Sequence, residues 1–242
     1  MNRPFFLRLT LFLALALPAW AAETYTPFRP DMAAGATYMI DAHLLHPTQF
    51  AVGFREVVNK TKAINGKDAA ALIAYLQEKD VPVVIGPGGV PFMADGHHTI
   101  RALLDSKQSD KTVYGHILAN WASLDEKNFW AQMLEHHYAY LANKDGTGTR
   151  PAGELPKSLL EMQSNIYRGL GWAVMKAGGF EEKKGPDGFF QEFYWGDYFR
   201  DKVRWNDADD ADFKRAVKEA VALAHEPAAA KLPGYMPAPK TP

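Results

Sequence analysis

The spacing of hydrophobic residues predicts a mixed α/β arrangement in the first half of the chain. A run of β-branched residues at 81–85 predicts a strand, and residues 90–94, beyond a glycine-rich turn, predict its partner. Residues 67–79 place apolar side chains on one face at helical spacing, which predicts a helix before this pair. Shorter apolar runs at 38–41 and 112–118 indicate two further strands.

The second half of the chain has the pattern of amphipathic and aromatic helices. Ser123, followed three residues later by Glu126, fits a capping box that opens a helix to about residue 143. From residue 226 onward alanine, proline and lysine dominate, so we expect a disordered tail at 226–242. Four more helices are predicted at residues 155–162, 165–177, 189–205 and 209–225.

The first residues have the features of a secretory signal peptide. Arg3 and Arg8 flank the start of an apolar run at 9–17, and Ala19-Trp20-Ala21 supplies a small-x-small cleavage site. The run is about half the roughly 20 apolar residues that a membrane-spanning helix needs, so we expect cleavage and no stable membrane insertion. The expected mature protein is periplasmic or secreted.

These patterns divide the chain into five segments. The fold class they predict is α/β (or α+β), a small mixed-sheet unit with a C-terminal α-helical extension that could share one core. A hydrophobic content of 47% is enough for a packed globule and argues against a disordered chain. The segments are a signal peptide at 1–21, an irregular arm at 22–37, the α/β unit at 38–120, the helical extension at 121–225 and the tail at 226–242.

Cysteine and charge content narrow the chemistry. The chain has no cysteine, which excludes disulfides, thiolate metal sites and cysteine nucleophiles. It has 27 Lys+Arg against 28 Asp+Glu, a net charge of −1. A protein of this charge lacks the broad positive field that supplies most non-specific affinity for nucleic acids. Charge therefore gives no support for a nucleic-acid partner, although a local basic groove stays open.

The segment from Asp95 to Thr99 is the strongest candidate for a functional site. A predicted strand ends just before it, and a predicted helix begins at Thr99. Helix N-termini present unpaired N–H groups, and Gly96 lets the backbone come close to an anion. His97 and His98 can donate to phosphate oxygens or shuttle protons, and Asp95 could hold a divalent metal such as Mg²⁺. The alternative is structural, because Asp-Gly is a common turn dipeptide and Thr99 can cap a helix.

Ordered segments on both sides of this loop follow a common pattern. They are Leu45-His46-Pro47-Thr48-Gln49, Gly53, Glu56-Val57-Val58, Pro82-Val83-Val84-Ile85, Asp95-Gly96-His97-His98, Phe129-Trp130, Tyr167-Arg168 and the stretch Glu192-Phe193-Tyr194-Trp195-Gly196-Asp197. Their order resembles the ParB-like nuclease subgroup of the ParB/sulfiredoxin superfamily over residues 38–205. Glu56-Val57-Val58 and the Asp-Gly-His-His loop are also similar to the free serine kinases of that superfamily.

The resemblance implies a ParB/sulfiredoxin-like sheet unit and a hydrolytic action on phosphodiesters. A phosphate would bind on the backbone from Gly96 to Thr99, with Arg101 nearby in the helix. By similarity to the kinases, Glu56 would act as a general base or metal ligand. His97 or His98 would stabilise charge or donate a proton to the leaving group. The implied partner is a phosphate-containing small molecule or a nucleic acid.

Departures from the family pattern keep other functions open. Thr99 stands where ParB-like loops often have an arginine that grips phosphate, and the nearest arginine is Arg101. Sulfiredoxins need a cysteine in this loop, so sulfinic acid reduction is excluded. The alternatives are a nucleotide-binding phosphotransferase, like the free serine kinases, and a non-catalytic exported binding protein. Buried hydrogen bonds that tie up His97 and His98 would favour the binding protein.

Other polar residues favour structural interpretations. Arg168 could reach across to an anion, but an ion pair with a residue such as Glu192 or Asp197 is the favoured interpretation. His136 and His137 are neighbours on a predicted helix, so their side chains diverge by about 100° and cannot chelate one metal together.

Overall fold

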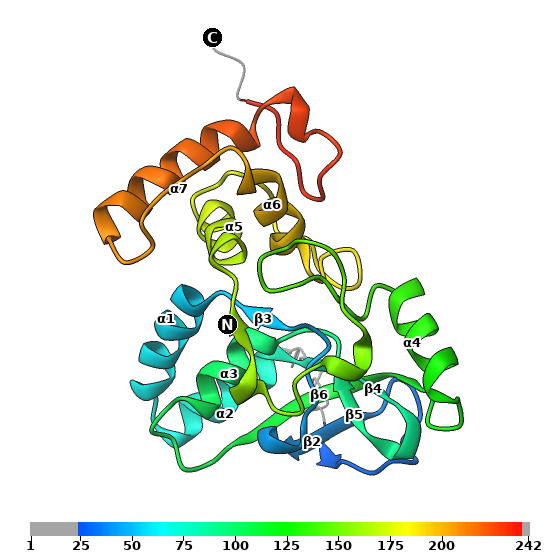
Figure 1. Ribbon diagram of the computed structural model, residues 1–242. Helices are drawn as coiled ribbons and strands as arrows, with labels where there is room; N and C mark the ends of the chain where they lie inside the picture. The colour runs from blue at the N-terminus through cyan, green and yellow to red at the C-terminus, as the bar shows by residue number, and fades with distance from the viewer. Residues whose placement is uncertain (1–23, 239–242) are drawn as a thin grey trace, which may run out of the picture.

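A mixed five-stranded sheet forms the base of the described chain, residues 24–238 of a computed structural model (Figure 1). β4 and β6 are parallel, whereas β6 pairs with β2, and β4 with β5, in antiparallel fashion. The α/β (α+β) class predicted from the sequence is confirmed, and each predicted strand forms with small shifts at its ends. The strands lie in the order β1 (Thr26–Pro27), β2 (Thr37–Asp41), β6 (Thr112–Asn120), β4 (Val81–Ile85) and β5 (Pro91–Met93).

Two predictions concern the N-terminal residues, the irregular arm and the signal peptide. The arm expected at 22–37 contributes β1 and the first residue of β2, so part of it is regular. The signal peptide expected at 1–21 lies outside the described residues. No helix in residues 24–238 is long and apolar enough to cross a membrane.

Helices cover both faces of the interior strand β4. All five of its residues are buried, and alternate side chains of a strand point to opposite faces. Val81, Val83 and Ile85 pack in the core shared with the first three helices, whereas Val84 packs against the fourth. We call residues 24–135 the sheet unit. Its helices are α1 (Phe54–Asn65), α2 (Ala69–Lys79), α3 (His97–Leu104) and α4 (Glu126–Glu135).

Three further helices form a second unit, which lies above the sheet in Figure 1. They enclose a separate apolar cluster that includes Leu170, Trp195 and a row of alanines along the last helix. The Trp195 indole stacks on Phe180, with ring centroids 4.3 Å apart. We call residues 166–238 the helical unit. Its helices are α5 (Ile166–Lys176), α6 (Gln191–Arg200) and α7 (Asp210–Ala224).

The chain between the two units is irregular, which corrects two predictions. The helix expected to continue to about residue 143 ends at Glu135, and His137 turns the chain with a left-handed φ of +57°. The helix expected at 155–162 does not form, because Leu155 before Pro156 is extended (ψ 142°) and Ser158 is extended again, with its Oγ accepting a hydrogen bond from the Leu160 N–H at 3.2 Å. Two short 3-10 turns form instead, η3 (Ala152–Glu154) and η4 (Leu159–Glu161). Residues Gln163–Ser164 then form β7, which pairs with β3 (Ala51–Val52).

The C-terminal segment also differs from its prediction. Residues 227–238 were expected to be disordered, but they pack on the helical unit and begin with the turn η5 (Pro227–Ala229). The carbonyl of Pro233 accepts hydrogen bonds from Gln191 Nε2 at 2.9 Å and Trp195 Nε1 at 2.8 Å. Buried donors on α6 therefore hold a segment whose composition alone indicates disorder.

Candidate anion-binding site

The loop between β5 and α3 has the geometry of a tight turn into a helix. Gly96 adopts φ +89°, a left-handed conformation that favours glycine, and precedes the first turn of α3. The helix begins at His97, two residues earlier than the sequence indicated, so both histidines lie in its first turn. Their side chains consequently point into the protein, and both residues are buried.

His97 is fixed in one tautomer by the chain before β3. Its Nε2 accepts a hydrogen bond from the Thr48 N–H at 3.1 Å, so Nδ1 carries the proton. Nδ1 is buried and has no hydrogen-bond partner within the described residues. Burial, and then the charge of Arg168, lower the pKa of His97 to about 3. The imidazole is therefore neutral at pH 7, with one unused N–H group.

His98 is held in the same way by the start of α1. Its Nε2 accepts the Gly53 N–H at 2.9 Å and lies 3.9 Å from Oε2 of Glu56. Burial, followed by the charge of Arg168, lowers the pKa of His98 well below its ordinary value. The adjacent histidines thus tie two points of one segment, Thr48 and Gly53, to the first turn of α3.

Glu56 is a buried carboxylate in the first turn of α1. The sequence pattern instead predicts Glu56 before the first helix. It forms an ion pair with Nη1 of Arg168, and its Oε1 accepts a hydrogen bond from Nζ of Lys60 at 2.8 Å. Burial alone would raise its pKa, but Arg168 and Lys60 outweigh this effect and hold the pKa of Glu56 below its ordinary range. The carboxylate is therefore ionised, and its oxygens already have cationic partners.

Arg168 brings the helical unit into the same site. This buried guanidinium also pairs with Oε1 of Glu192 at 3.3 Å, as the sequence had suggested, while the partnership with Glu56 was not foreseen. Its Nε has no hydrogen-bond partner among residues 24–238. A Cβ atom added to Gly53 would lie 2.8 Å from Cα of Gly169, so α1 and α5 approach closely here. The two units therefore meet at the carboxylate of Glu56.

Two residues border this buried cluster on its more accessible side. Asp95 is exposed, yet the protein around its carboxyl displaces enough water to raise its pKa. Lys60 is partly exposed, and its Nζ donates to Oγ1 of the buried Thr99 at 2.9 Å. Lys60 was not identified from the sequence, although it follows Glu56 by four residues and so shares its face of α1.

Arg101 has a different environment from the one expected of a phosphate ligand. Its Nη1 donates to the carbonyls of Leu159 at 3.0 Å and Leu160 at 3.2 Å, and its Nε pairs with Asp105 at 2.9 Å. These contacts secure the η4 turn against α3. They give Arg101 a structural role and argue against the predicted phosphate contact.

The metal ligand expected from the sequence is Asp95. Within residues 24–238 no three His, Asp or Glu side chains come together as metal ligands. Mg²⁺ is commonly held by one or two carboxylates, with water and substrate phosphates completing its shell. Asp95, as a single exposed carboxylate, fits that kind of binding and not a closed protein site.

Comparisons with known proteins agree with this two-unit architecture. A family model described as "Putative ParB-like nuclease" matches residues 34–201, a span that includes Glu56, the Asp-Gly-His-His loop and Arg168. The crystal structure of protein Atu1540 from Agrobacterium tumefaciens is similar, with a TM-score of 0.72 and 31% sequence identity. That match covers 84% of this chain and 97% of the other. No curated protein matches the chain.

Proposed function

The chain belongs to the ParB-like nuclease family, and from this premise we propose that it acts on phosphodiesters beside the Asp95–Gly96 loop. One observation carries the proposal: α1, α3 and α5 bring anion-binding groups together next to an exposed carboxylate. Lys60 supplies positive charge at the accessible edge, Arg168 offsets the charges of Glu56 and Glu192 behind it, and the first turn of α3 supplies backbone N–H groups. Such an arrangement suits a phosphate group, either in a small molecule or in a nucleic acid.

Phosphate binding is proposed at the N-terminus of α3. Backbone N–H groups from Gly96 to Thr99 would face the phosphate, as at other helix N-termini that bind anions. Lys60 is the cation best placed to meet a ligand from solvent, because its side chain is 27% exposed, whereas that of Arg168 is 7% exposed. Arg168 would hold Glu56 and, through it, Lys60 in position.

The histidines receive narrower roles than the sequence suggested. Both Nε2 atoms accept backbone hydrogen bonds, so neither can donate a proton from that atom. The unused Nδ1–H of His97 is a donor that a small movement of the loop could direct to a phosphate oxygen. His98 positions Gly53 at the start of α1 and is a positioning residue.

Asp95 is the residue we assign to activate the attacking water. Glu56 was the earlier candidate, but its low pKa and its two cationic partners make it a weak base. The exposed carboxylate of Asp95, with its raised pKa, is a better acceptor. Where a divalent ion takes part, Asp95 would bind it, and the ion would supply Lewis acidity and lower the pKa of a bound water.

Hydrolysis assays on variants test this proposal. Purified protein is incubated with bis(p-nitrophenyl) phosphate and with single- and double-stranded DNA and RNA, with and without Mg²⁺ or Mn²⁺. We expect cleavage that falls at least about 100-fold in Asp95→Asn and Lys60→Gln. Asp105→Asn, at the C-terminal end of α3 and paired with Arg101, is the matched control. Absence of cleavage of every substrate by the unaltered protein would overturn the proposal.

A second candidate function is supported by the histidine geometry. His97 and His98 are tied up in buried hydrogen bonds, the arrangement expected of a non-catalytic binding protein on this scaffold. Such a protein would bind phosphate or a short oligonucleotide without turnover. Calorimetric binding of inorganic phosphate, lost in Lys60→Gln and without hydrolysis of any substrate above, would favour this function over the first.

A further inference from the structure

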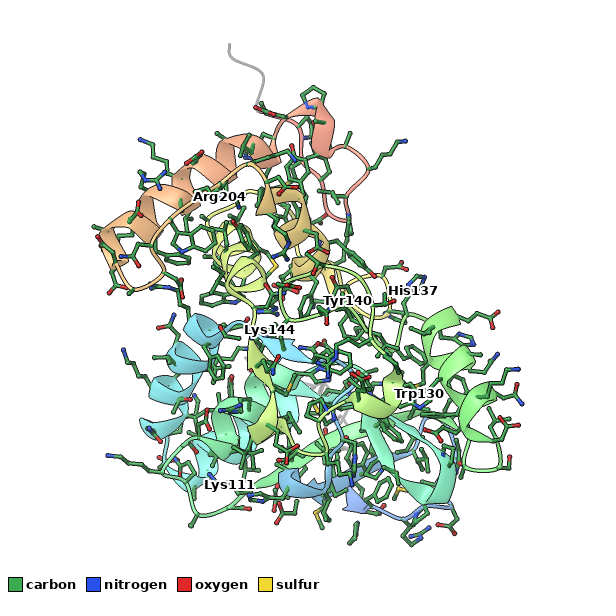
Figure 2. All side chains as sticks on the ribbon, viewed as in Figure 1. Lys111, Trp130, His137, Tyr140, Lys144 and Arg204 are labelled. Carbon is green, nitrogen blue, oxygen red and sulfur yellow. The ribbon has the colours of Figure 1, made fainter. Side chains whose placement is uncertain are left out.

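A cavity of about 450 Å³ lies on the α4 face of the sheet unit, beside the site described above. It is bounded by the turn from β4 to β5, by the first residues of α4 and by the loop 152–157. Figure 2 shows Trp130 of α4 on the side of the helix that faces these strands. Nothing in the proposed chemistry at Asp95 uses this cavity.

The walls of the cavity are largely aromatic. Phe92 and Trp130 meet edge to face, with ring centroids 5.3 Å apart and an interplanar angle of 77°. Phe129 lies behind both and is buried, whereas Phe92 and Trp130 are partly exposed. A flat ligand can therefore reach two aromatic rings whose positions are fixed by packing with each other and with Phe129.

Three polar side chains stand among these rings. His46 is half-buried, and burial together with the charge of Lys157 lowers its pKa, so the ring is neutral at pH 7. A neutral imidazole offers one donor and one acceptor. Glu126 and Lys157 are exposed and line the opening. Flat apolar walls with a few donors and acceptors at the edges suit a heteroaromatic ring better than an aliphatic chain.

The cavity is connected to the loop by two short segments. His46 lies two residues before Thr48, whose N–H binds Nε2 of His97. Phe92 lies three residues before Asp95, which corresponds to roughly 10 Å along an extended strand. The cavity and the N-terminus of α3 thus lie on opposite faces of one edge of the sheet, and the sugar and phosphate of a ligand whose ring fills the cavity would extend around that edge toward α3.

We propose that the cavity binds a nucleobase of the substrate, so that the ligand is a nucleotide or a short single strand. The choice of ligand rests on the proposed action on phosphodiesters. A base would stack on the face of Trp130, meet Phe92 edge to face and exchange hydrogen bonds with His46 at its own edge. The net charge of −1 favours a short ligand, because a long duplex gains most of its affinity from a broad positive field.

Calorimetric titration of the full-length protein tests the proposal with three probes: adenosine, adenosine 5′-monophosphate and ribose 5-phosphate. Adenosine should bind, and Trp130→Ala should weaken its binding about ten-fold or more, as expected for loss of one stacking partner. Ala152→Phe, which fills the cavity from the loop side, should do the same. Trp172→Ala, a partly buried tryptophan of the helical unit, is the control and should leave adenosine binding unchanged.

The outcomes separate this proposal from the proposed function. Absence of adenosine binding at millimolar concentration overturns the nucleobase cavity, as does binding that neither Trp130→Ala nor Ala152→Phe weakens. Adenosine binding that both variants weaken supports the cavity even if no phosphodiester is cleaved, in which case only the hydrolytic function fails. Equal affinity for adenosine and its monophosphate would overturn the link between the cavity and the α3 terminus.

Discussion

At the scale of single residues, burial sets the charge of the side chains that form the site. His97 and His98 are neutral at pH 7 because burial and Arg168 lower their pKa values. Glu56 is ionised in spite of its burial, since Arg168 and Lys60 are its direct partners. Removal of one partner of a buried ion pair typically costs about 3–5 kcal/mol, because the other charge is left uncompensated. The junction between the units therefore depends on charges that must be present together.

The lowered pKa values of the two histidines predict a loss of stability in mild acid. A histidine in the unfolded chain binds a proton near pH 6.5, whereas His97 in the folded protein does so only at about 3. Below about pH 6.5 the unfolded state binds more protons, so the free energy of unfolding falls as pH falls. Urea denaturation should show a decrease of about 2 kcal/mol from His97 between pH 7 and pH 5, and His98 should add to it in the same direction.

Glutamine substitutions provide the control for this pH dependence. His97→Gln and His98→Gln keep a hydrogen-bond acceptor near Nε2 and remove the titrating group, so each should reduce the slope. His137→Gln changes an exposed histidine outside the site and is the control. The unfolded-state range of glutamate, around pH 4.3, lies below the measured interval. Equal slopes in all four proteins would mean that His97 and His98 titrate normally in the folded state.

At the scale of elements, local signals made the segment from β4 to α3 predictable. A few adjacent residues determine each of its features: the β-branched run of β4, the glycine turn after it and the Asp95–Gly96 turn. The pairing of Glu56 with Arg168 joins residues 112 positions apart, and only the packing of α5 on α1 brings them together. The hydrogen bonds to Thr48 and Gly53 are equally non-local, so the sequence identified both histidines without showing that they face inward.

The contact between α1 and α5 predicts an unusual sensitivity at Gly53. Its φ of −82° suits any residue, so an alanine there causes no backbone strain. The added Cβ would nevertheless lie 2.8 Å from Cα of Gly169, and α5 would have to move. Gly53→Ala should lower the free energy of unfolding by about 1–3 kcal/mol, the usual cost of overpacking, as measured by urea denaturation.

Gly66, at the other end of α1, is the matched control for Gly53. Its φ is −84°, and an added Cβ would come no nearer than 3.7 Å to the carbonyl of Ala63. Gly66→Ala should therefore change stability little. If both substitutions have the same small effect, the close approach of Gly53 and Gly169 does not hold in solution.

At the scale of the whole molecule, the apolar cores of the two units are joined by an aromatic cluster, which includes Phe190 and Phe193, and by polar contacts. Figure 2 places Tyr140 where the sheet unit and the helical unit meet, and its hydroxyl donates to Asp197 of α6 at 2.8 Å. On another part of the junction, Arg55 of α1 pairs with Asp207 at 2.9 Å and Asp210 at 2.8 Å. Its guanidinium also lies 4.1 Å from the ring centre of Phe213. One side chain thus fixes the start of α7 to the sheet unit.

This arrangement predicts that loss of Arg55 loosens α7 without unfolding the sheet unit. Amide hydrogen exchange should become several-fold faster in residues 207–217 of Arg55→Gln, because local opening of that segment no longer breaks contacts with α1. Amide hydrogen exchange in β4, which is buried between helices on both faces, should be the same in Arg55→Gln as in the unaltered protein. Arg215→Gln is the matched control, since Arg215 binds Asp212 and Glu219 of α7 and the carbonyl of Arg204, all within the helical unit. Equal exchange in the two variants would mean that contacts within the helical unit, and not the junction through Arg55, hold that helix in place.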